Sequence, residues 1–355
     1  MPKEKTEPFL IRPIQETDLD AVFNLASQTG PGMTSLPADK AILEAKIQES
    51  INSFKINPTK PGNESYRFVM ELDDKIVGIA AIRARVGGFD PSYSYEICKA
   101  RHQSEALGVD KEVEYLKLSK EHKGASIISS LFVSPDYRSM GLGQYLSQAR
   151  FLFIADFPER FTETITAEMR GVIDEAGRSP FWEGTVRHFF DMGFEKADYL
   201  STKDKGFIAD LMPQYPIYIP LLRDSVIEVI GKVHDKTKPA MKFLEAQGFA
   251  RDGHVDIFDA GPRVAVKTNE IKTIKKSQAA TLEIGMDIGA ALVSNSKLDF
   301  RVKLVSGAMT KEDTDSLNLF SDQLTGSIPP EIGNLTNLRY LSLGNQLTGS
   351  IPPEI

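Results

Sequence analysis

The chain has 355 residues, of which 41% are hydrophobic and 26% are charged, and its formal net charge is −7. This length is enough for two domains of ordinary size, and the composition is that of a globular protein. The acidic balance excludes a generally basic surface of the kind that attracts nucleic acid or anionic membranes. The single cysteine, Cys98, excludes a disulfide framework and suits a reducing compartment, so we expect a cytoplasmic protein.

Neither a membrane span nor a secretory signal is expected. The chain has no run of about 18 apolar residues, and its first residues, Met-Pro-Lys-Glu-Lys-Thr-Glu, lack an apolar core. The five histidines have no metal-ligand spacing, and one cysteine cannot form a Cys/His cluster. We therefore expect no bound metal.

The first third of the chain predicts alternating strands and helices. The predicted elements are a strand at 9–13, a helix at 18–26, a helix at 41–54 and a hairpin of strands 66–72 and 75–85. In the second helix, apolar residues from Leu43 to Phe54 recur at steps of four, four and three. Residues 89–124 are polar and mixed, which predicts an inserted loop with a short strand near 113–118.

The most informative motif is Arg138-x-x-Gly141-x-Gly143, which lies between an apolar strand at 127–133 and a helix. Glycines let backbone N–H groups approach an anion closely. A helix start adds unpaired N–H donors and the positive end of the helix dipole. Together these features predict a cradle for a pyrophosphate. An ordinary strand–turn–helix connection is the alternative.

The chain after this cradle predicts a repeated ending. A long helix, a strand at 164–169, a loop at 171–177 and a helix from Ser179-Pro180 come first. That helix ends at Gly193-Phe194, and a later helix that starts at Lys238-Pro239 ends in the same way at Gly248-Phe249. Each ending predicts a helix stop that leads into a strand. Further strands are expected at 264–267, 290–294 and 300–305.

The two endings predict two tandem domains, at 1–200 and 201–316, of which the second is shorter. Only the first contains the Arg-x-x-Gly-x-Gly motif. We therefore expect a single nucleotide site, in the first domain.

From residue 317 the sequence changes to a leucine-rich repeat. Leu-Thr-Gly-Ser-Ile-Pro occurs at 324–329 and again at 347–352, in a form that resembles the plant-type subclass. Such repeats bury their leucines only against neighbouring repeats, and about three are needed for a stable stack. Fewer than two are present, so we expect 317–355 to be a fused or truncated remnant that is weakly ordered, docked or self-associating. A partner-binding module is the alternative.

The strand, cradle and helix around Gly141 resemble the acyl-coenzyme-A loop of the GCN5-related N-acetyltransferase (GNAT) superfamily. Longer segments point to one family: Thr-Ser-Leu-Pro at 34–37, Ala-Glu-Met-Arg-Gly-Val-Ile-Asp-Glu at 167–175, Ser-Pro-Phe-Trp at 179–182, Val-Ile-Gly-Lys-Val-His at 229–234 and Asp-Ile-Phe-Asp-Ala-Gly-Pro at 256–262. Through them, most of residues 9–310 resembles the arginine N-succinyltransferase family. The resemblance implies an α/β (α+β) fold of two tandem GNAT-like domains with mixed central sheets flanked by helices.

The resemblance also implies a reaction, the transfer of succinyl from succinyl-CoA to the α-amino group of L-arginine in arginine catabolism. Succinyl-CoA would be a co-substrate, with no metal and no permanently bound cofactor. The family's proton donor corresponds to His234, and its succinyl-CoA contact corresponds to Leu131. The residues implied around the rest of the coenzyme are Val133, Arg138, Gly141 and Gly143.

Elementary chemistry supports a histidine in this role. The attacking amine must be neutral and the departing thiolate must be protonated, and an imidazole titrates near neutrality without special tuning. His234 precedes the helix that starts at Lys238, so it could face the cradle across the interface between the domains; a polar surface histidine is the alternative. Strand 127–133 should splay from its neighbour, so that the backbone of Leu131 can pair with the pantetheine arm and polarise the thioester.

Substrate contacts are predicted from charge. A guanidinium favours a planar carboxylate, and the candidates are Glu168, Asp174, Glu175, Asp256 and Asp259. Arg170 or Arg85 is placed to hold the succinyl carboxylate. A structural ion pair is the alternative for each of these residues.

Two further functions stay open. The chain could be an arginine/ornithine succinyltransferase subunit of a paired complex, or an inactive acyltransferase scaffold whose repeat tail binds proteins. The expected partners are the small-molecule substrates and a second copy or a paired subunit, without nucleic acid or membrane.

Overall fold

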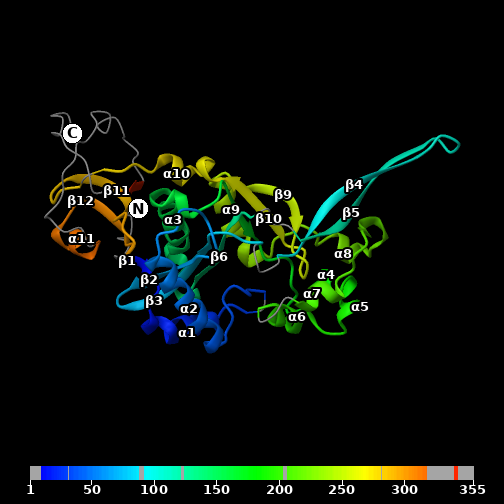
Figure 1. Cartoon of the computed structure of the whole chain (residues 1–355), viewed down its shortest axis with the longest axis horizontal. Helices are drawn as coiled ribbons and strands as arrows, with labels where there is room; N and C mark the ends of the chain where they lie inside the picture. Colours follow the sequence, from blue (N-terminus) through cyan, green and yellow to red (C-terminus); the bar gives the residue numbers. More distant parts are fainter. Residues whose placement is uncertain are drawn as a thin grey trace.

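The computed structural model describes residues 9–30, 32–87, 92–120, 124–202, 206–280 and 282–317, and the backbone of 340–342. These residues form one mixed 13-stranded sheet with helices packed against it (Figure 1). The strand order is β13-β11-β12-β1-β2-β3-β6-β7-β10-β9-β4-β5-β8. The expected α/β class, with a mixed sheet flanked by helices, is confirmed.

The elements have the following bounds. The strands are β1 (Phe9–Pro13), β2 (Ser65–Leu72), β3 (Lys75–Arg83), β4 (Ser94–Ser104), β5 (Val109–Ser119), β6 (Ser126–Val133), β7 (Thr164–Glu168), β8 (Ile217–Tyr218), β9 (Ala250–Val255), β10 (Pro262–Lys267), β11 (Asp287–Ser294), β12 (Val302–Ala308) and β13 (Tyr340–Ser342). The α-helices are α1 (Leu19–Ala26), α2 (Lys40–Lys55), α3 (Leu142–Asp156), α4 (Pro180–Gly184), α5 (Arg187–Phe190), α6 (Phe194–Ser201), α7 (Gly206–Leu211), α8 (Asp224–Ile227), α9 (Lys238–Ala246), α10 (Lys272–Lys276) and α11 (Lys311–Ser316). Two 3-10 helices, η2 (Pro135–Met140) and η5 (Asp235–Thr237), lie near the site.

The predicted β2–β3 hairpin lies near the centre of the sheet. Asp73 and Asp74 form its turn with φ angles of 48° and 57°, the positive values that a two-residue hairpin turn requires. In β2, Phe68 belongs to the buried cluster around α3, whereas Val69 packs with α1 and α2. Because successive side chains of a strand point to opposite faces, α1 and α2 cover one face and α3 covers the other.

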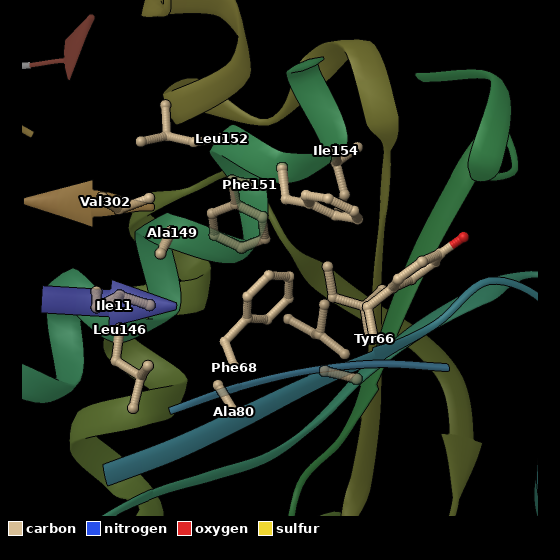
Figure 2. Close-up of a cluster of buried hydrophobic side chains, with 14 of the residues drawn as sticks. Ile11, Tyr66, Phe68, Ala80, Leu146, Ala149, Phe151, Leu152, Ile154 and Val302 are labelled. Atoms are coloured by element: carbon tan, nitrogen blue, oxygen red, sulfur yellow. The ribbon is translucent and has the colours of Figure 1, made fainter. Parts of the chain in front are cut away.

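Helix α3 lies at the centre of the larger core. Every residue from Leu146 to Ile154 is buried, as expected for a helix that is enclosed on all sides. Figure 2 shows Phe151 and Phe68 in one cluster of side chains that joins α3 to the sheet. Each such buried phenylalanine contributes about 1.5–3 kcal/mol relative to exposure, so the start of α3 is held firmly against β6.

The inserted loop predicted at 89–124 is wrong, because residues 94–104 and 109–119 form β4 and β5, two strands of 11 residues each. The short strand expected near 113–118 is confirmed, since it lies within β5. Cross-strand ion pairs join Lys99 to Glu112 at 2.6 Å and Arg101 to Asp110 at 2.5 Å. The outer part of this ribbon projects away from the rest of the molecule (Figure 1). Since its exposed strands carry charged pairs rather than alternating apolar residues, the hydrophobic pattern did not reveal them.

The ending predicted at Gly193-Phe194 is also wrong. The segment after Pro180 forms two short helices, and α6 follows where a strand was expected. Asp191, with φ 48°, takes the left-handed position that ends α5, while Gly193 is extended and begins α6. Gly248 has φ 102° and does lead into β9. The two Gly-Phe steps are therefore not equivalent.

The sheet contains strands from both sides of residue 200. β10 pairs with β7, β9 pairs with β4, and β12 pairs with β1. The domain boundary predicted near residue 200 stays a prediction. The leucine-rich tail lies outside the described residues, apart from Leu317 and the backbone of β13, which pairs in parallel with β11.

Candidate active site

β6 and β7 are paired at one end and separate toward the other. Their parallel register joins Ser126 to Ile165 and Ile127 to Thr166. Beyond it, the two strands line a cavity of about 220 Å³. Ser130, with φ 54°, marks a bulge at which the register with β3 shifts. The predicted splay of strand 127–133 is confirmed.

Several other segments complete this cavity. The lining residues outside β6 and β7 are Gly32 to Ser35, Arg150, Met169, Arg170, Asp198, Thr237, Ala240, Leu244, Asp256 and Asp259. The hydroxyl of Ser130 donates a hydrogen bond to the carbonyl oxygen of Ser35 at 3.2 Å. This bond holds the 32–35 segment over the bulge of β6. The cavity therefore combines residues from both predicted domains.

The glycine motif forms an open turn at the start of α3. Gly141 has φ 70°, and a Cβ atom added there would meet no heavy atom within 4 Å; at Gly143 it would meet only Val133, at 3.8 Å. Arg138 Nε donates to the carbonyl oxygen of Val133 at 3.1 Å, and its guanidinium lies 5.2 Å from the ring of Phe132. Side chains do not fill the space beside these two glycines, and a helix start of this kind suits an anion such as a diphosphate. Within the turn, the N–H of Gln144 already donates to the carbonyl oxygen of Gly141 at 3.1 Å.

His234 is fixed against the end of β7. Its backbone N–H donates to the carbonyl oxygen of Arg170 at 2.9 Å. Its Nδ1 accepts a hydrogen bond from the backbone N–H of Lys236 at 3.1 Å. His234 is not itself among the lining residues, but Thr237, which lines the cavity, donates its hydroxyl hydrogen to the His234 carbonyl at 2.9 Å. His234 therefore lies next to a residue that lines the cavity.

The neutral form of His234 is favoured. Burial lowers the pKa of its imidazole, and the positive charges of Arg170 and Lys236 lower it further. The hydrogen bond from Lys236 acts in the same direction, because a protonated Nδ1 could not accept it. A neutral ring with Nδ1 as acceptor carries its proton on Nε2, so Nε2–H is the donor that remains for chemistry.

Four carboxyl groups line the opposite part of the cavity. Glu168, at the end of β7, is exposed there. Asp198 Oδ2 accepts a hydrogen bond from the backbone N–H of Gly32 at 3.1 Å. Asp256 Oδ1 accepts two backbone N–H groups of the loop that follows it, at 2.7 and 2.9 Å. Asp259 is buried, with 5% of its surface exposed.

These carboxyl groups hold protons more tightly than usual. Burial, followed by the charge of the neighbouring Asp256, raises the pKa of Asp198 to about 7. Burial, followed by the charge of Glu168, raises the pKa of Asp256 to about 6, and burial also raises the pKa of Asp259 well above its ordinary value. A cation bound among these carboxyls would pair with negative charges that are poorly hydrated. Among the described residues, no cluster of His, Cys, Asp and Glu has a metal-binding arrangement.

Two glycines bring the end of β7 against the β9–β10 loop. A Cβ atom at Gly171 would collide with the Asp259 carbonyl oxygen, and one at Gly261 would collide with that of Met169. Asp259 joins the two segments, because Oδ2 accepts from the N–H of Gly171 and Oδ1 from the N–H of Gly261, both at 2.8 Å. A side chain at either glycine would move these carboxyls away from β7.

The structure brings five of the predicted residues together in the cavity, namely Leu131, Glu168, Arg170, Asp256 and Asp259. The other predicted residues do not line it: His234, Val133, Arg138, Gly141, Gly143, Asp174, Glu175 and Arg85. Asp174 does not, since its carboxylate accepts two backbone N–H groups of an exposed turn and pairs with Arg178 at 2.9 Å. Arg85 is exposed and lies against Gly124, outside the lining.

Two lining residues, Arg150 and Asp198, were missed. Arg150 lies in the buried centre of α3, between Ala149 and Phe151. A charged residue inside an otherwise apolar helix is a signal that could have identified it. Asp198 gave no signal, because α6 carries several polar residues and nothing in the sequence showed which of them faces inward.

A splayed strand that leads into a helix start, with a histidine next to the resulting cavity, is the arrangement expected of an acyl-CoA-dependent N-acyltransferase. The cradle follows β6 directly in the chain, and β6 lines the cavity. One extended ligand can therefore occupy both the cradle and the cavity. Within the described part of the chain, no helix has the length and apolar character needed to cross a membrane.

Comparison with known proteins identifies the family. The model of the family "Arginine N-succinyltransferase beta subunit" matches residues 9–273. The arginine N-succinyltransferase of Yersinia pestis (strain Pestoides F) is 45% identical over 277 residues, which cover 77% of this chain and 79% of that protein. The one from Citrobacter koseri is 41% identical over 323 residues, covering 89% and 93%. The solved arginine/ornithine succinyltransferase subunit AI from Pseudomonas aeruginosa is 33% identical, with a TM-score of 0.82 over 88% of this chain and 96% of that one. The chain belongs to the arginine N-succinyltransferase family, as the resemblance in its sequence predicted.

Proposed function

We propose that the chain is an arginine N-succinyltransferase, which transfers succinyl from succinyl-CoA to the α-amino group of L-arginine. The observation that carries this proposal is a single cavity lined by two chemically different sets of residues. One set is the splayed edge of β6, which continues along the chain into the cradle at Gly141. The other is the group of carboxyls around Asp198 and Asp256, which suits a guanidinium.

The reaction is a direct acyl transfer in a ternary complex. The neutral α-amine attacks the thioester carbonyl, a C–N bond forms, and the C–S bond breaks. One proton leaves nitrogen and one arrives on sulfur, so the products are the amide and the free thiol of CoA. In this proton relay, the Nε2–H of His234 would donate a hydrogen bond to the departing sulfur, and the proton lost by the amine would reach the sulfur through solvent, because Nδ1 already accepts the N–H of Lys236.

Backbone groups would hold the coenzyme. The diphosphate would lie on the N–H groups between Arg138 and Gly143, and the pantetheine arm would run along β6 past Val133 to Leu131. The open bulge of β6 at Ser130 supports this path, because a bulge leaves ladder groups unpaired. One such N–H can polarise the thioester carbonyl.

The acceptor would be recognised by charge. The carboxylates of Glu168, Asp198 and Asp256 would surround the guanidinium, and Arg170 would hold the α-carboxylate of the amino acid. Among the described residues, Nε of Arg170 has no hydrogen-bond partner, which supports a ligand contact. Asp174, tied to Arg178, is a poorer candidate than the sequence suggested.

A thiol-release assay tests this function. Purified protein with succinyl-CoA and L-arginine should release CoA in equal amount to Nα-succinylarginine, identified by NMR. Ornithine in place of arginine separates the two acceptors, and we expect the planar guanidinium to be preferred because paired carboxylates can bind it through several hydrogen bonds. Thiol release that does not depend on an amino acid would refute the proposal. Failure to bind CoA resin would instead favour an inactive scaffold.

The assembly is proposed from the names of the relatives. The matching family model is described as a beta subunit, and the P. aeruginosa structure as a subunit. We therefore expect a homo-oligomer or a paired subunit. We also expect a cytoplasmic location, because succinyl-CoA is the proposed substrate. Light scattering after size exclusion measures the mass directly, and a monomer at all concentrations would contradict this expectation.

A further inference from the structure

Arg150 is an arginine buried in the core without a carboxylate partner. It lies in α3 with only 2% of its surface exposed, and it lines the cavity beside Ser129 of β6. Nη1 donates to the carbonyl oxygen of Ser129 at 3.3 Å, and Nη2 donates to the hydroxyl of Ser147 at 2.6 Å. Nε has no hydrogen-bond partner among the described residues. A guanidinium has five N–H donors, so these two bonds leave several of them for a ligand.

Burying a charge in this way is unfavourable unless something pairs with it. Burial alone lowers the pKa of Arg150, to about 9, so the group is still a cation at neutral pH. The other fully buried arginine of this core, Arg160, has a carboxylate nearby, because its Nε lies 3.8 Å from Oε1 of Glu159, and it also donates to the hydroxyl of Tyr66 and to the carbonyl oxygen of Ile56 at 3.0 Å. Arg150, in contrast, has no carboxylate partner among the described residues, and it lines the cavity.

We infer that Arg150 binds the terminal carboxylate of the succinyl group and thereby selects a dicarboxylic acyl-CoA over a plain one. This inference rests on the proposed function and names the residue that determines its acyl specificity. The geometry fits, because the acyl chain would lie between β6 and β7, where Ser129 contacts both the cavity and Arg150. The planar guanidinium can pair with a carboxylate through two parallel hydrogen bonds.

Arg170, which the sequence suggested for this carboxylate, is less suitable. The charges of Asp259 and Asp198 act on its guanidinium, so Arg170 lies among the carboxyls that we propose for the acceptor. Among the described residues, no carboxylate pairs with Arg150. In this assignment, Arg150 binds the acyl donor and Arg170 binds the acceptor.

Butyryl-CoA is the informative probe, because its acyl chain matches succinyl in length but ends in a methyl group. Wild-type protein should prefer succinyl-CoA by about 100-fold or more in kcat/KM, since a site built for a polar group rejects its apolar analogue strongly. In Arg150→Met, kcat/KM for succinyl-CoA should fall by about 100-fold while that for butyryl-CoA stays level or rises. Arg150→Lys should recover part of the preference.

The control is Arg160→Met, which removes an equally buried arginine that does not line the cavity. It should lower the melting temperature and leave the ratio of the two kcat/KM values unchanged. An equal loss on both acyl-CoAs in Arg150→Met would show that Arg150 only supports the bulge of β6. A raised KM for arginine with either donor would assign Arg150 to the acceptor. Either result overturns the inference.

Direct binding separates this inference from the proposed function. Calorimetry of succinyl-CoA and butyryl-CoA needs no acceptor and no turnover. If the wild-type protein binds succinyl-CoA more tightly and Arg150→Met removes the difference, the inference stands even if arginine is not the acceptor. If Arg150→Met does not fold, the same comparison is made with Arg150→Lys, where an unchanged preference refutes the role.

Discussion

The protonation state of His234 follows from its immediate neighbours. The N–H of Lys236 occupies Nδ1, burial disfavours a charged ring, and Arg170 adds a nearby positive charge. All three favour a neutral imidazole with its proton on Nε2. Such a ring presents Nε2–H as a hydrogen-bond donor to a departing sulfur.

Replacing His234 by Asn tests its role with little structural change. The Asn oxygen can accept the N–H of Lys236 as Nδ1 does, so the start of η5 should persist. We expect kcat to fall by about 10²- to 10⁴-fold, the usual size of a general acid–base contribution, with the KM for succinyl-CoA almost unchanged. His254→Asn, which removes a histidine outside the cavity, serves as the control. A full-rate His234→Asn enzyme would exclude the relay.

Asp198 should make stability and substrate binding depend on pH. Its pKa is raised to about 7 in the folded protein, so folding favours the protonated form and stability decreases as pH rises from about 4 toward 7. Asp198→Asn should therefore raise the melting temperature at pH 8 and have little effect at pH 4. The same variant should raise the KM for arginine by about tenfold, the worth of one charge-assisted hydrogen bond.

Calorimetry and steady-state kinetics check both parts of this prediction. A melting temperature that changes equally at pH 4 and pH 8 would show that Asp198 acts through packing rather than charge. An unchanged KM for arginine would remove it from the guanidinium site.

The strand–cradle–helix element was predictable because its signal is local. The strand before Arg138, the two glycines and the helix after them are contiguous, and each follows from a short-range rule about backbone conformation or apolar periodicity. The β4–β5 ribbon was not predictable, since the charged pairs that join its strands, such as Lys99 with Glu112, connect residues that sequence alone does not align. The end of α4 at Gly184 was not predictable either. Val226, which is distant in the sequence, packs against this glycine.

Gly141→Ala tests the cradle as an element. Its φ of 70° strains any other residue, which costs about 1 kcal/mol, and the added methyl group would point into otherwise open space at the turn. We expect the KM for succinyl-CoA to rise by about tenfold or more, with the KM for arginine unchanged. Gly108→Ala is the matched control, because Gly108 has φ 59°, equally open surroundings and a place at the tip of the β4–β5 ribbon. Equal effects of the two substitutions on the KM would contradict a cradle at Gly141.

At the scale of the whole molecule, the cavity depends on contacts between distant segments. Gly171 meets Gly261, His234 meets Arg170, and segment 32–35 meets β6. The sequence identified most of these segments through the family resemblance, but not the contacts, because close backbone approach at a glycine leaves no periodic signal. Asp198 left no such signal either, because only the folded structure shows that it lines the cavity. Arg150 left a local signal, a charge inside an apolar helix, but the sequence did not show that it lines the cavity.

The leucine-rich tail should be dispensable for turnover. All residues that line the cavity lie between Gly32 and Asp259, and α11, before the tail, completes its own capping box at Thr310 and Asp313. Deletion of residues 318–355 should leave kcat/KM for both substrates within about twofold, because the tail contributes no lining group. Steady-state kinetics of the full and shortened chains measure this, and a loss beyond about tenfold would mean that the tail supports the site.

The most direct test of the account is a crystal structure with arginine and a non-reactive ketone analogue of succinyl-CoA. We expect the diphosphate on the backbone N–H groups of 138–143, the acyl chain between β6 and β7 with its carboxylate on Arg150, and Nε2 of His234 within hydrogen-bond distance of the group that replaces the sulfur. A coenzyme bound elsewhere, or an imidazole beyond the reach of that group, would contradict the central claim.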